Sequence, residues 1–202
     1  MSEFKLQCKC GQLQGLVRDF SVWRSTRAVC HCADCQAYAR HLDELSDQGG
    51  NTLDEFGGTD VLQMTPAQIT FHQGAEQLRC LRLTAKGLYR WYADCCKTPI
   101  ANTIAPGLPF VGIVHTALAV DGPLDANVDA NVDAAVGPVQ FYMQGRGAIA
   151  PRPGQKVHNG FPVGWFLATF PWFLLGKIRR KQKPSPFFDN SGQPSVTPEV
   201  LG

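Results

Sequence analysis

Short runs in which hydrophobic and polar residues alternate recur along most of the chain. In residues 1–30 the run Leu13–Arg18 alternates in this way and glycines bound it, which predicts two short strands. Residues 49–68 mix glycines with apolar pieces such as Val61–Met64 and are expected to form a loop, a strand and a turn. Further strands are predicted for residues 69–72, 78–83, 88–92, 110–114 and 139–143. The pattern is that of a mainly β protein.

One segment near the N-terminus has the period of a helix instead. Tyr38, Leu42 and Leu45 stand at positions i, i+4 and i+7 among polar residues, and two glycines follow. This spacing predicts one short amphipathic helix over residues 34–47.

Residues 161–176 form the most apolar segment of the chain, sixteen positions without a charge. The segment contains Pro162 and Pro171 and is shorter than the roughly 20 residues of a membrane-spanning helix, so we do not expect it to cross a bilayer. We favour an apolar helix packed on the sheet or in a dimer. The alternative is a helix in a membrane interface, whose basic end at residues 177–183 would meet anionic lipid. The tail from Ser185 is expected to be extended.

An acidic four-residue unit repeats over residues 125–134 and invites a calcium interpretation. An EF-hand loop needs Gly at its sixth position and Glu at its twelfth. Counted from Asp125, these positions are Ala130 and Val136. We therefore interpret the repeat as a solvated surface insertion.

The chain has 202 residues, of which 44% are hydrophobic and 18% are charged. This length and composition suit one compact domain, which we place at residues 1–160 with the helix and tail of 161–202 packed on it. The formal net charge of +2 provides no field that would attract nucleic acid, and the apolar content excludes disorder. Function must therefore come from local chemistry.

Cysteine is the unusual residue in the composition. The chain has eight cysteines, about twice what an ordinary intracellular domain carries. The N-terminal residues show no basic stretch leading into an apolar run, so we expect no signal peptide and a cytoplasmic location, where thiols stay reduced. Pairs separated by one residue, such as Cys8 with Cys10 and Cys30 with Cys32, make strained disulfides but good metal ligands. Metal binding is therefore favoured over disulfides.

When the thiols are grouped by which of them could bind a common ion, they predict two zinc ions per chain. Cys8 and Cys10, joined by Cys95 and Cys96, would form a closed four-sulfur site of the structural kind. The second group, Cys30, Cys32 and Cys35, supplies three thiolates and leaves a fourth position for water or substrate. Three thiolates and one zinc ion carry a formal charge of minus one, which favours capture of a substrate thiol over activation of water.

Two other interpretations of these thiols stay open. His31 could complete a closed site with the three thiols of the second group, which would make that site structural. Cys80 lies inside a predicted strand and is best interpreted as a small core residue.

Three motifs carry a resemblance to a known family. The sequence has CxCG at Cys8–Gly11, CHCxxC within Cys30–Gln36, and a cysteine followed by Thr-Pro within Cys96–Ile100. In this order the motifs resemble those of the glutathione-dependent formaldehyde-activating enzyme and centromere protein V family, over roughly residues 4–115. The resemblance implies a β-tent of antiparallel sheets, two zinc sites and carbon-sulfur lyase chemistry that condenses glutathione with formaldehyde. It also implies that Cys8, Cys10 and Cys96 belong to the structural zinc, and the CHCxxC thiols to the catalytic zinc.

The chain departs from the family pattern, CxxCGTP, at the third motif. Ala93 stands where the family has its first cysteine, and Lys97 replaces the family's glycine. An additional thiol, Cys95, directly precedes Cys96. The fourth sulfur of the closed site is then Cys95, Cys80 or absent, and we favour Cys95.

Two functions from different classes follow. The first is a zinc-dependent carbon-sulfur lyase-like enzyme acting on a glutathione-type thiol and a small aldehyde, with His31 and Asp34 as candidate general bases. The second is a zinc-stabilised binding module that uses the aromatic C-terminal segment, 161–183, for a membrane or protein partner. Nucleic acid is not an expected partner. Residues available near the motifs for the carboxylates of a thiol substrate are Arg24, Arg27, Arg40, Arg90 and Asn102.

Overall fold

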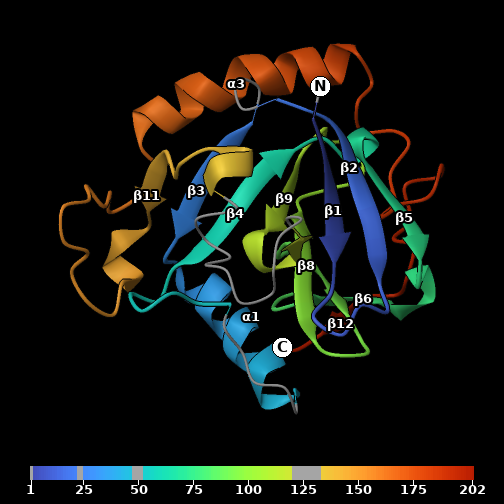
Figure 1. Ribbon diagram of the computed structural model, residues 1–202, viewed down its shortest axis with the longest axis horizontal. Helices are drawn as coiled ribbons and strands as arrows, with labels where there is room; N and C mark the ends of the chain where they lie inside the picture. The colour runs from blue at the N-terminus through green and yellow to red at the C-terminus, as the bar shows by residue number, and fades with distance from the viewer. Residues whose placement is uncertain (1, 22–24, 47–51, 120–132) are drawn as a thin grey trace.

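The structure, a computed structural model, describes residues 2–21, 25–46, 52–119 and 133–202. These residues form two sheets and two longer helices (Figure 1). The strands are β1 (Ser2–Gln7), β2 (Gln14–Phe20), β3 (Thr26–Cys30), β4 (Thr59–Met64), β5 (Ile69–Gln73), β6 (Leu78–Arg82), β7 (Tyr89–Ala93), β8 (Thr98–Thr103), β9 (Val111–Val114), β10 (Leu118–Ala119), β11 (Phe141–Met143) and β12 (Glu199–Val200). The helices are α1 (Ala33–Glu44) and α3 (Val163–Ile178), with short 3-10 turns η2 (Pro66–Gln68), η3 (Ala75–Gln77), η4 (His115–Ala117) and η5 (Gly145–Gly147).

The strands are divided between a small and a large sheet. The four-stranded sheet has the order β10-β1-β2-β5, and the eight-stranded sheet has the order β11-β3-β4-β9-β8-β7-β6-β12. Neighbouring strands are antiparallel, except that β11 pairs parallel with β3 and β12 parallel with β6. A mainly β fold with largely antiparallel sheets, a short helix after the CHCxxC motif and a C-terminal helix is thereby confirmed.

The main core lies between the two sheets. Val17 and Phe20 of β2 meet Leu62 of β4 and Ile113 of β9, and all four side chains are buried. Trp91 of β7 is fully buried in this core, and its indole N–H donates to Thr103 Oγ1 at 2.9 Å. Alternation along each strand therefore gives the large sheet one face directed at the small sheet.

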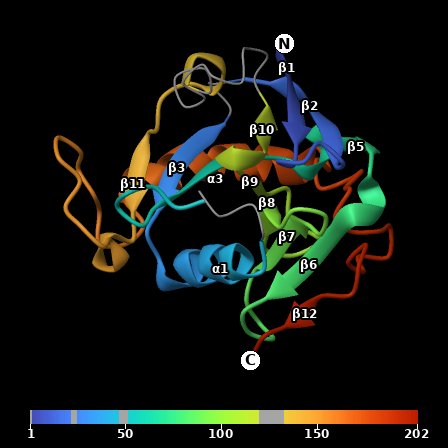
Figure 2. The same cartoon turned by 60° about the horizontal axis from the view of Figure 1, so that its bottom comes forward.

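The opposite face of the large sheet is covered by helices. Tyr38 and Leu42 of α1 pack on Leu81 and Tyr92, and the Tyr38 hydroxyl donates to the Trp91 carbonyl at 3.0 Å. Helix α3 lies at the other end of β3 and β4 from α1 (Figure 1), and Figure 2 shows α1 and α3 on separate parts of the molecule. The two helices thus share this face of the large sheet. The cavity described below lies on the same face and is lined by residues of both helices.

The C-terminal tail runs back into the main core. Phe187 is fully buried and Phe188 nearly so, and their rings contact Trp91 at centroid distances of 5.2 and 5.7 Å. Beyond them β12 extends the large sheet beside β6. The tail is therefore extended over much of its course but contributes core side chains.

Three details differ from the sequence prediction. Residues 2–30 contain three strands, because the stretch that ends in Cys30 forms β3 as an interior strand of the large sheet. Helix α1 ends at Glu44 instead of continuing to residue 47. Leu45 is consequently the C-cap residue, beyond the last helical turn, and is 50% exposed instead of buried with Leu42.

Helix α3 covers the sheet with one side only. A stripe of large apolar side chains faces solvent, with exposed fractions of 50–73%: Val163, Leu167, Phe170, Leu174 and Ile178. Of the helices in the described ranges, none combines the length and the hydrophobicity that a bilayer-spanning segment needs. The packed helix predicted for residues 161–176 is present over Val163–Ile178, with an apolar stripe left uncovered.

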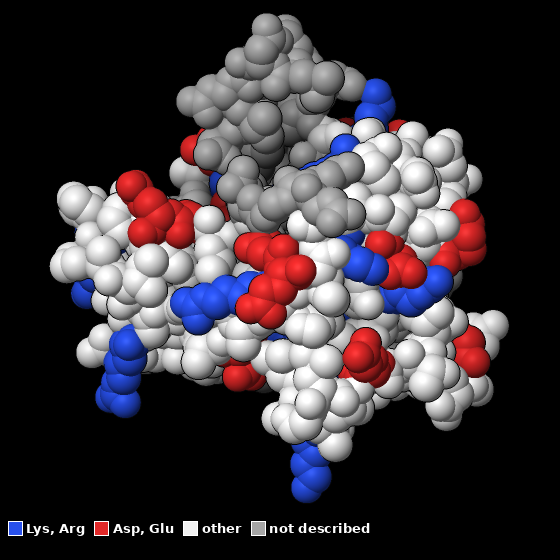
Figure 3. All heavy atoms as spheres, turned by 90° about the horizontal axis from the view of Figure 1, so that it is seen from below, with Lys and Arg blue, Asp and Glu red and all other residues white. Residues whose placement is uncertain are grey.

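Surface charge is mixed on the face drawn in Figure 3, where acidic and basic side chains are interspersed. Most of the acidic repeat, residues 125–132, lies outside the described residues. Its last aspartate, Asp133, pairs with the buried guanidinium of Arg27, which also holds Asp60.

The burial of the tail predicts a large effect of a single substitution. Phe187→Ala should lower the free energy of unfolding by about 3–5 kcal/mol, because it removes a fully buried ring from the main core. Phe170→Ala on α3 is the matched control, because that ring is 65% exposed. Urea unfolding followed by tryptophan fluorescence measures both. Equal, small losses in the two variants would mean that the tail is not part of the core.

Candidate metal centres

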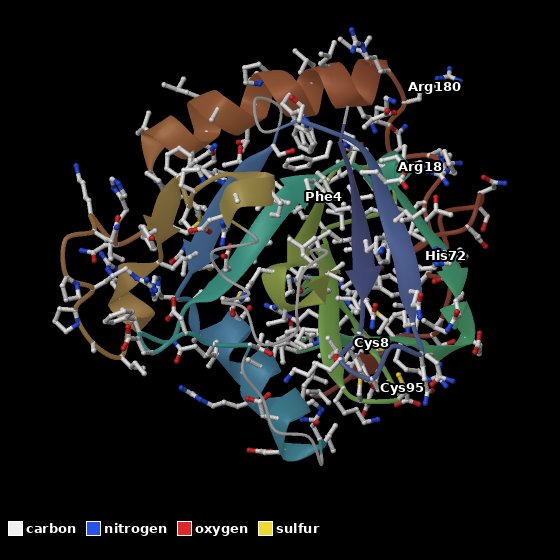
Figure 4. All side chains as sticks on the ribbon, viewed as in Figure 1. Phe4, Cys8, Arg18, His72, Cys95 and Arg180 are labelled. Carbon is white, nitrogen blue, oxygen red and sulfur yellow. The ribbon has the colours of Figure 1, made fainter. Side chains whose placement is uncertain are left out.

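The first cysteine cluster lies where turns of the two sheets meet. Cys8 and Cys10 stand in the turn between β1 and β2, and Cys95 and Cys96 in the turn between β7 and β8. Figure 4 shows Cys8 and Cys95 side by side. The four sulfur atoms all lie within 4.8 Å of one another, so the cluster could hold a metal ion that links the two sheets.

The distances fit a tetrahedral metal. Cys8 Sγ lies 3.5 Å from Cys10 Sγ and 3.7 Å from Cys95 Sγ, and the Cys95 and Cys96 sulfurs are 3.9 Å apart. Tetrahedral zinc with bonds of about 2.3 Å to sulfur spaces its ligands by about 3.8 Å. The Cys10 and Cys95 sulfurs are closer, at 3.3 Å, so a small adjustment of this pair would complete a tetrahedral four-sulfur site.

The turn that presents Cys95 and Cys96 has an unusual backbone. Lys97 adopts a left-handed conformation with φ of 54°, which glycine adopts at least cost. This is the position at which the resembled family has glycine. The ammonium of Lys97 forms an ion pair with Asp94 across the turn. The turn that brings both thiols to the cluster is thus formed despite the substitution.

Hydrogen-bond donors surround the sulfurs of this cluster. The backbone N–H of Leu13 donates to Cys8 Sγ at 3.3 Å, and Cys96 Sγ lies 3.0 Å from the hydroxyl of Thr98. Burial raises the pKa of Cys96, but the hydrogen bond with Thr98 and backbone N–H groups outweigh it and lower the pKa to about 7. Such donors stabilise thiolate, the form that binds metal.

Cys80 stands apart from both clusters. It is 3% exposed in β6, and its sulfur contacts the carbonyl of Leu81 at 3.9 Å. Burial raises its pKa to about 12. Among the described residues the groups of sulfurs close enough to share an ion do not include Cys80. Its surroundings are those of a core residue.

The second cluster forms where β3 leads into α1. Cys30 ends the strand, Cys32 is the N-cap of the helix, and Cys35 lies in its first turn. Their three sulfurs lie within 4.8 Å of one another and could hold a metal ion. The backbone N–H of Cys35 donates to Cys32 Sγ at 3.4 Å. Hydrogen bonds from the Cys30 and Cys35 thiols, together with this N–H, hold the pKa of Cys32 far below its usual value.

His31 points away from this cluster. Its side chain is fully buried, and Nδ1 lies 3.0 Å from the carbonyl oxygen of Met143. Gln36 holds the same segment by donating to the His31 carbonyl at 3.0 Å. The imidazole is not part of the three-sulfur group, so a closed site with His31 as fourth ligand finds no support in this geometry. Asp34, by contrast, is exposed at the start of α1.

A buried arginine lies beside the three thiols. The guanidinium of Arg90 is 2% exposed, with Nη1 3.8 Å from Cys35 Sγ and 3.4 Å from Asn102 Oδ1. It also lies 4.0 Å from the exposed Asp34 carboxylate and 5.2 Å from the centre of the Tyr38 ring. A buried cation is costly unless negative charge compensates it. The position of Arg90 therefore favours thiolate in this cluster.

The second cluster opens into a cavity of about 610 Å³. Cys30, Cys32 and Cys35 lie in its wall together with Asp34 and Arg90. Strands β3, β4, β7, β8 and β9 supply the floor. Aromatic residues of α3, together with Phe161 just before the helix, supply the facing wall: Trp165, Phe166, Phe170, Trp172 and Phe173. A cavity of this size suits a small organic ligand. Two of its residues belong to the set named above for substrate carboxylates, Arg90 and Asn102.

Two further members of that set, Arg27 and Arg40, do not line the cavity. Arg27 is held by Asp60 and Asp133, and Arg40 donates to Gln36 Oε1 at 2.8 Å. Arg24 lies outside the described residues. Among the four candidates that the structure describes, only Arg90 and Asn102 line the cavity.

Comparison with known proteins was made at the level of family, curated relatives and solved structures. Residues 1–199 match a family of unknown function, DUF6151. The chain belongs to this family. A search of curated proteins found no match. Among solved structures, the crystal structure of a Rhodobacter sphaeroides protein from a structural genomics programme is similar, with a TM-score of 0.41 and 16% identity, over 60% of this DUF6151 chain and 93% of that chain.

Sequence reasoning missed several residues of the cavity. Gln63, Met143 and the aromatic residues of α3 line it with the three thiols, although they lie far from the CHCxxC motif in the sequence. Gln63 and Val61 stand two residues apart on β4. This spacing shows that their side chains share a face of the strand, but not which other elements pack on that face. For the residues of α3, the only feature of the sequence that indicated a role in a binding site was the aromatic content of the segment.

The geometry of the first cluster predicts a difference between two cysteines. Cys95→Ser should reduce bound zinc by about one ion per chain, because it removes one of four clustered sulfurs. Cys80→Ala, the matched control, should keep the wild-type content. Elemental analysis of protein purified under reducing conditions measures both. Full zinc content in Cys95→Ser with loss in Cys80→Ala would show that Cys80 is the ligand.

Proposed function

We propose that this chain is a zinc-dependent carbon-sulfur lyase-like enzyme that joins a small-molecule thiol to a small aldehyde. The observation that carries the proposal is the three-thiol cluster in the wall of a cavity, beside the buried guanidinium of Arg90. The three motifs that resemble the glutathione-dependent formaldehyde-activating family support the same reaction class. In this proposal two zinc ions bind per chain, one in each cysteine cluster.

The donor sets suit zinc in two different roles. Four thiols at tetrahedral spacing are typical of a structural zinc site. Three thiols leave room for one further ligand, and their sulfurs lie in the cavity wall. Zinc bound there would keep a substrate thiol in its thiolate form at neutral pH.

The proposed reaction balances without an oxidant or reductant. The thiol sulfur attacks the aldehyde carbon, so that a carbon-sulfur bond forms and the carbonyl double bond becomes single. The proton that leaves the thiol ends on the former carbonyl oxygen, which gives a hemithioacetal. Cleavage of that adduct is the same reaction in reverse.

Residues of the chain would serve this reaction in distinct ways. Arg90 places a positive charge at the cluster and would stabilise negative charge that develops beside it. Asp34 lines the cavity, and its side chain is 70% exposed, so it can exchange a proton with water and is the candidate general base. His31 does not line the cavity.

Substitution of one clustered thiol tests the enzymatic proposal. Cys32→Ser should reduce thiol-dependent loss of formaldehyde to the uncatalysed rate, because the cluster loses a ligand. Cys80→Ala is the matched control and should keep wild-type activity. The assay follows free formaldehyde with a panel of thiols that includes glutathione, 2-mercaptoethanol and alkanethiols. Equal rates for wild type and Cys32→Ser with every thiol would refute the lyase proposal.

A second candidate function is attachment to an anionic membrane through α3. The exposed apolar stripe of this helix is the observation that favours it. Basic residues follow directly at the C-terminal end: Lys177, Arg179, Arg180, Lys181 and Lys183. Arg180 extends from that end in Figure 4. An apolar stripe beside positive charge is the arrangement by which interfacial helices bind anionic lipid.

Flotation with lipid vesicles tests this second candidate. The chain should float with vesicles rich in phosphatidylglycerol and less so in high salt, since salt screens the basic residues. Leu167→Asp should reduce binding at least tenfold, because Leu167 is 71% exposed in the stripe. Ile149→Asp, at a 63% exposed position outside α3, is the control. Absence of flotation together with dimers that Leu167→Asp dissociates would assign the stripe to a protein contact instead.

A further inference from the structure

The cavity has an ordered distribution of polar and apolar residues. On the cavity face, the strand register places Arg90, Asn102, Gly112 and Gln63 side by side across β7, β8, β9 and β4. These residues form a polar band, which borders the three-thiol cluster through the contact of Arg90 with Cys35. The reactive end of the cavity is therefore polar.

The next row along the same strands is apolar. Leu88, Ile104 and Phe110 directly flank the ends of β7, β8 and β9, two residues from Arg90, Asn102 and Gly112, and they also line the cavity. Aromatic residues of α3 lie opposite. Beyond its polar band the cavity is thus suited to an apolar group.

Two buried polar atoms of the cavity lack a partner in the part of the chain that the structure describes. Gln63 is 6% exposed, and its Oε1 accepts no hydrogen bond. The buried indole Nε1 of Trp165 likewise has no acceptor. Both residues line the cavity. Both atoms also have almost no accessible surface, so the polar groups that a ligand meets are those of the band beside the thiols.

The charges of the cavity match glutathione poorly. Among the described residues that line it, Arg90 is the only basic side chain and Asp34 the only carboxylate. Arg90 already contacts Cys35, Asn102 and Asp34. Glutathione carries two carboxylates and an ammonium group at neutral pH, and each needs a charged or strongly polar partner once it leaves water.

We propose that the thiol substrate has an apolar tail, an inference that rests on the proposed function for its reactive group. The sulfur lies at Cys30, Cys32 and Cys35, and the tail extends over Leu88, Ile104 and Phe110 beneath α3. The substrate class is an alkyl-chain thiol instead of a peptide thiol.

Binding of unreactive alcohols tests the tail separately from the chemistry. Titration calorimetry with n-butanol, n-hexanol and n-octanol should show affinity rising about fourfold for each buried methylene. Ile104→Asp should abolish octanol binding, because it places a charge in the apolar row, and it is tolerable because Ile104 is 44% exposed. Ile149→Asp, outside the cavity, should bind octanol as wild type does. No gain with chain length, or equal binding by the two variants, would overturn the inference.

The reactive group is tested by turnover. Octanethiol should support formaldehyde loss with a kcat/KM at least tenfold above that of glutathione. Ile104→Asp should remove this advantage, whereas Ile149→Asp, outside the cavity, should keep the wild-type rates with both thiols. Equal or better turnover with glutathione would overturn the tail assignment but leave the lyase proposal standing. Octanol binding without turnover of any thiol would instead refute the lyase proposal and, with it, the assignment of a thiol substrate.

Discussion

The large sheet has two faces that must be shielded from water, and most of the molecule is arranged around this constraint. The small sheet and the C-terminal phenylalanines cover one face around Trp91. Helices α1 and α3 cover the other face, but two helices with different positions cannot fill it completely. The space that remains is the cavity, and it lies where β3 delivers the CHCxxC thiols. The site is therefore a consequence of how the sheet is covered.

The two cysteine clusters differ in what surrounds them, and this difference suggests separate roles. The four-thiol cluster joins turns of two sheets and contains enough sulfur to complete a tetrahedral site. Its geometry suits stabilisation of a fold with many contacts between distant segments. The three-thiol cluster lacks a fourth protein sulfur, lies in a cavity wall and borders a buried cation. Incomplete ligation and a nearby charge are features that favour chemistry over structure.

Helix α3 connects the site with the surface. Its aromatic residues form one wall of the cavity, and its opposite side presents an apolar stripe to solvent next to basic residues. The lipid-binding and tail-binding proposals thus concern two sides of one helix. They are physically compatible, since an apolar substrate partitions into membranes. The two sets of side chains share Phe170, but Leu167 belongs to the stripe and Ile104 to the cavity, so each proposal can fail alone.

The sequence by itself determined the local elements and the local thiol groups. A period of two residues placed most strands, a period of 3.6 placed α1, and a run without charge placed α3. The CHCxxC spacing alone brought Cys30, Cys32 and Cys35 within reach of one ion. The sequence favoured Cys95 over Cys80 as the fourth sulfur but left both possible, because both lie near strands whose partners were unknown. The tertiary structure decided this by directing the turn at Cys95 toward Cys8 and burying Cys80 in the core. It also decided that Arg90, Asn102 and Gln63 form one band under α3. Alternation shows which residues of one strand share a face, whereas strand order and register depend on contacts between distant segments.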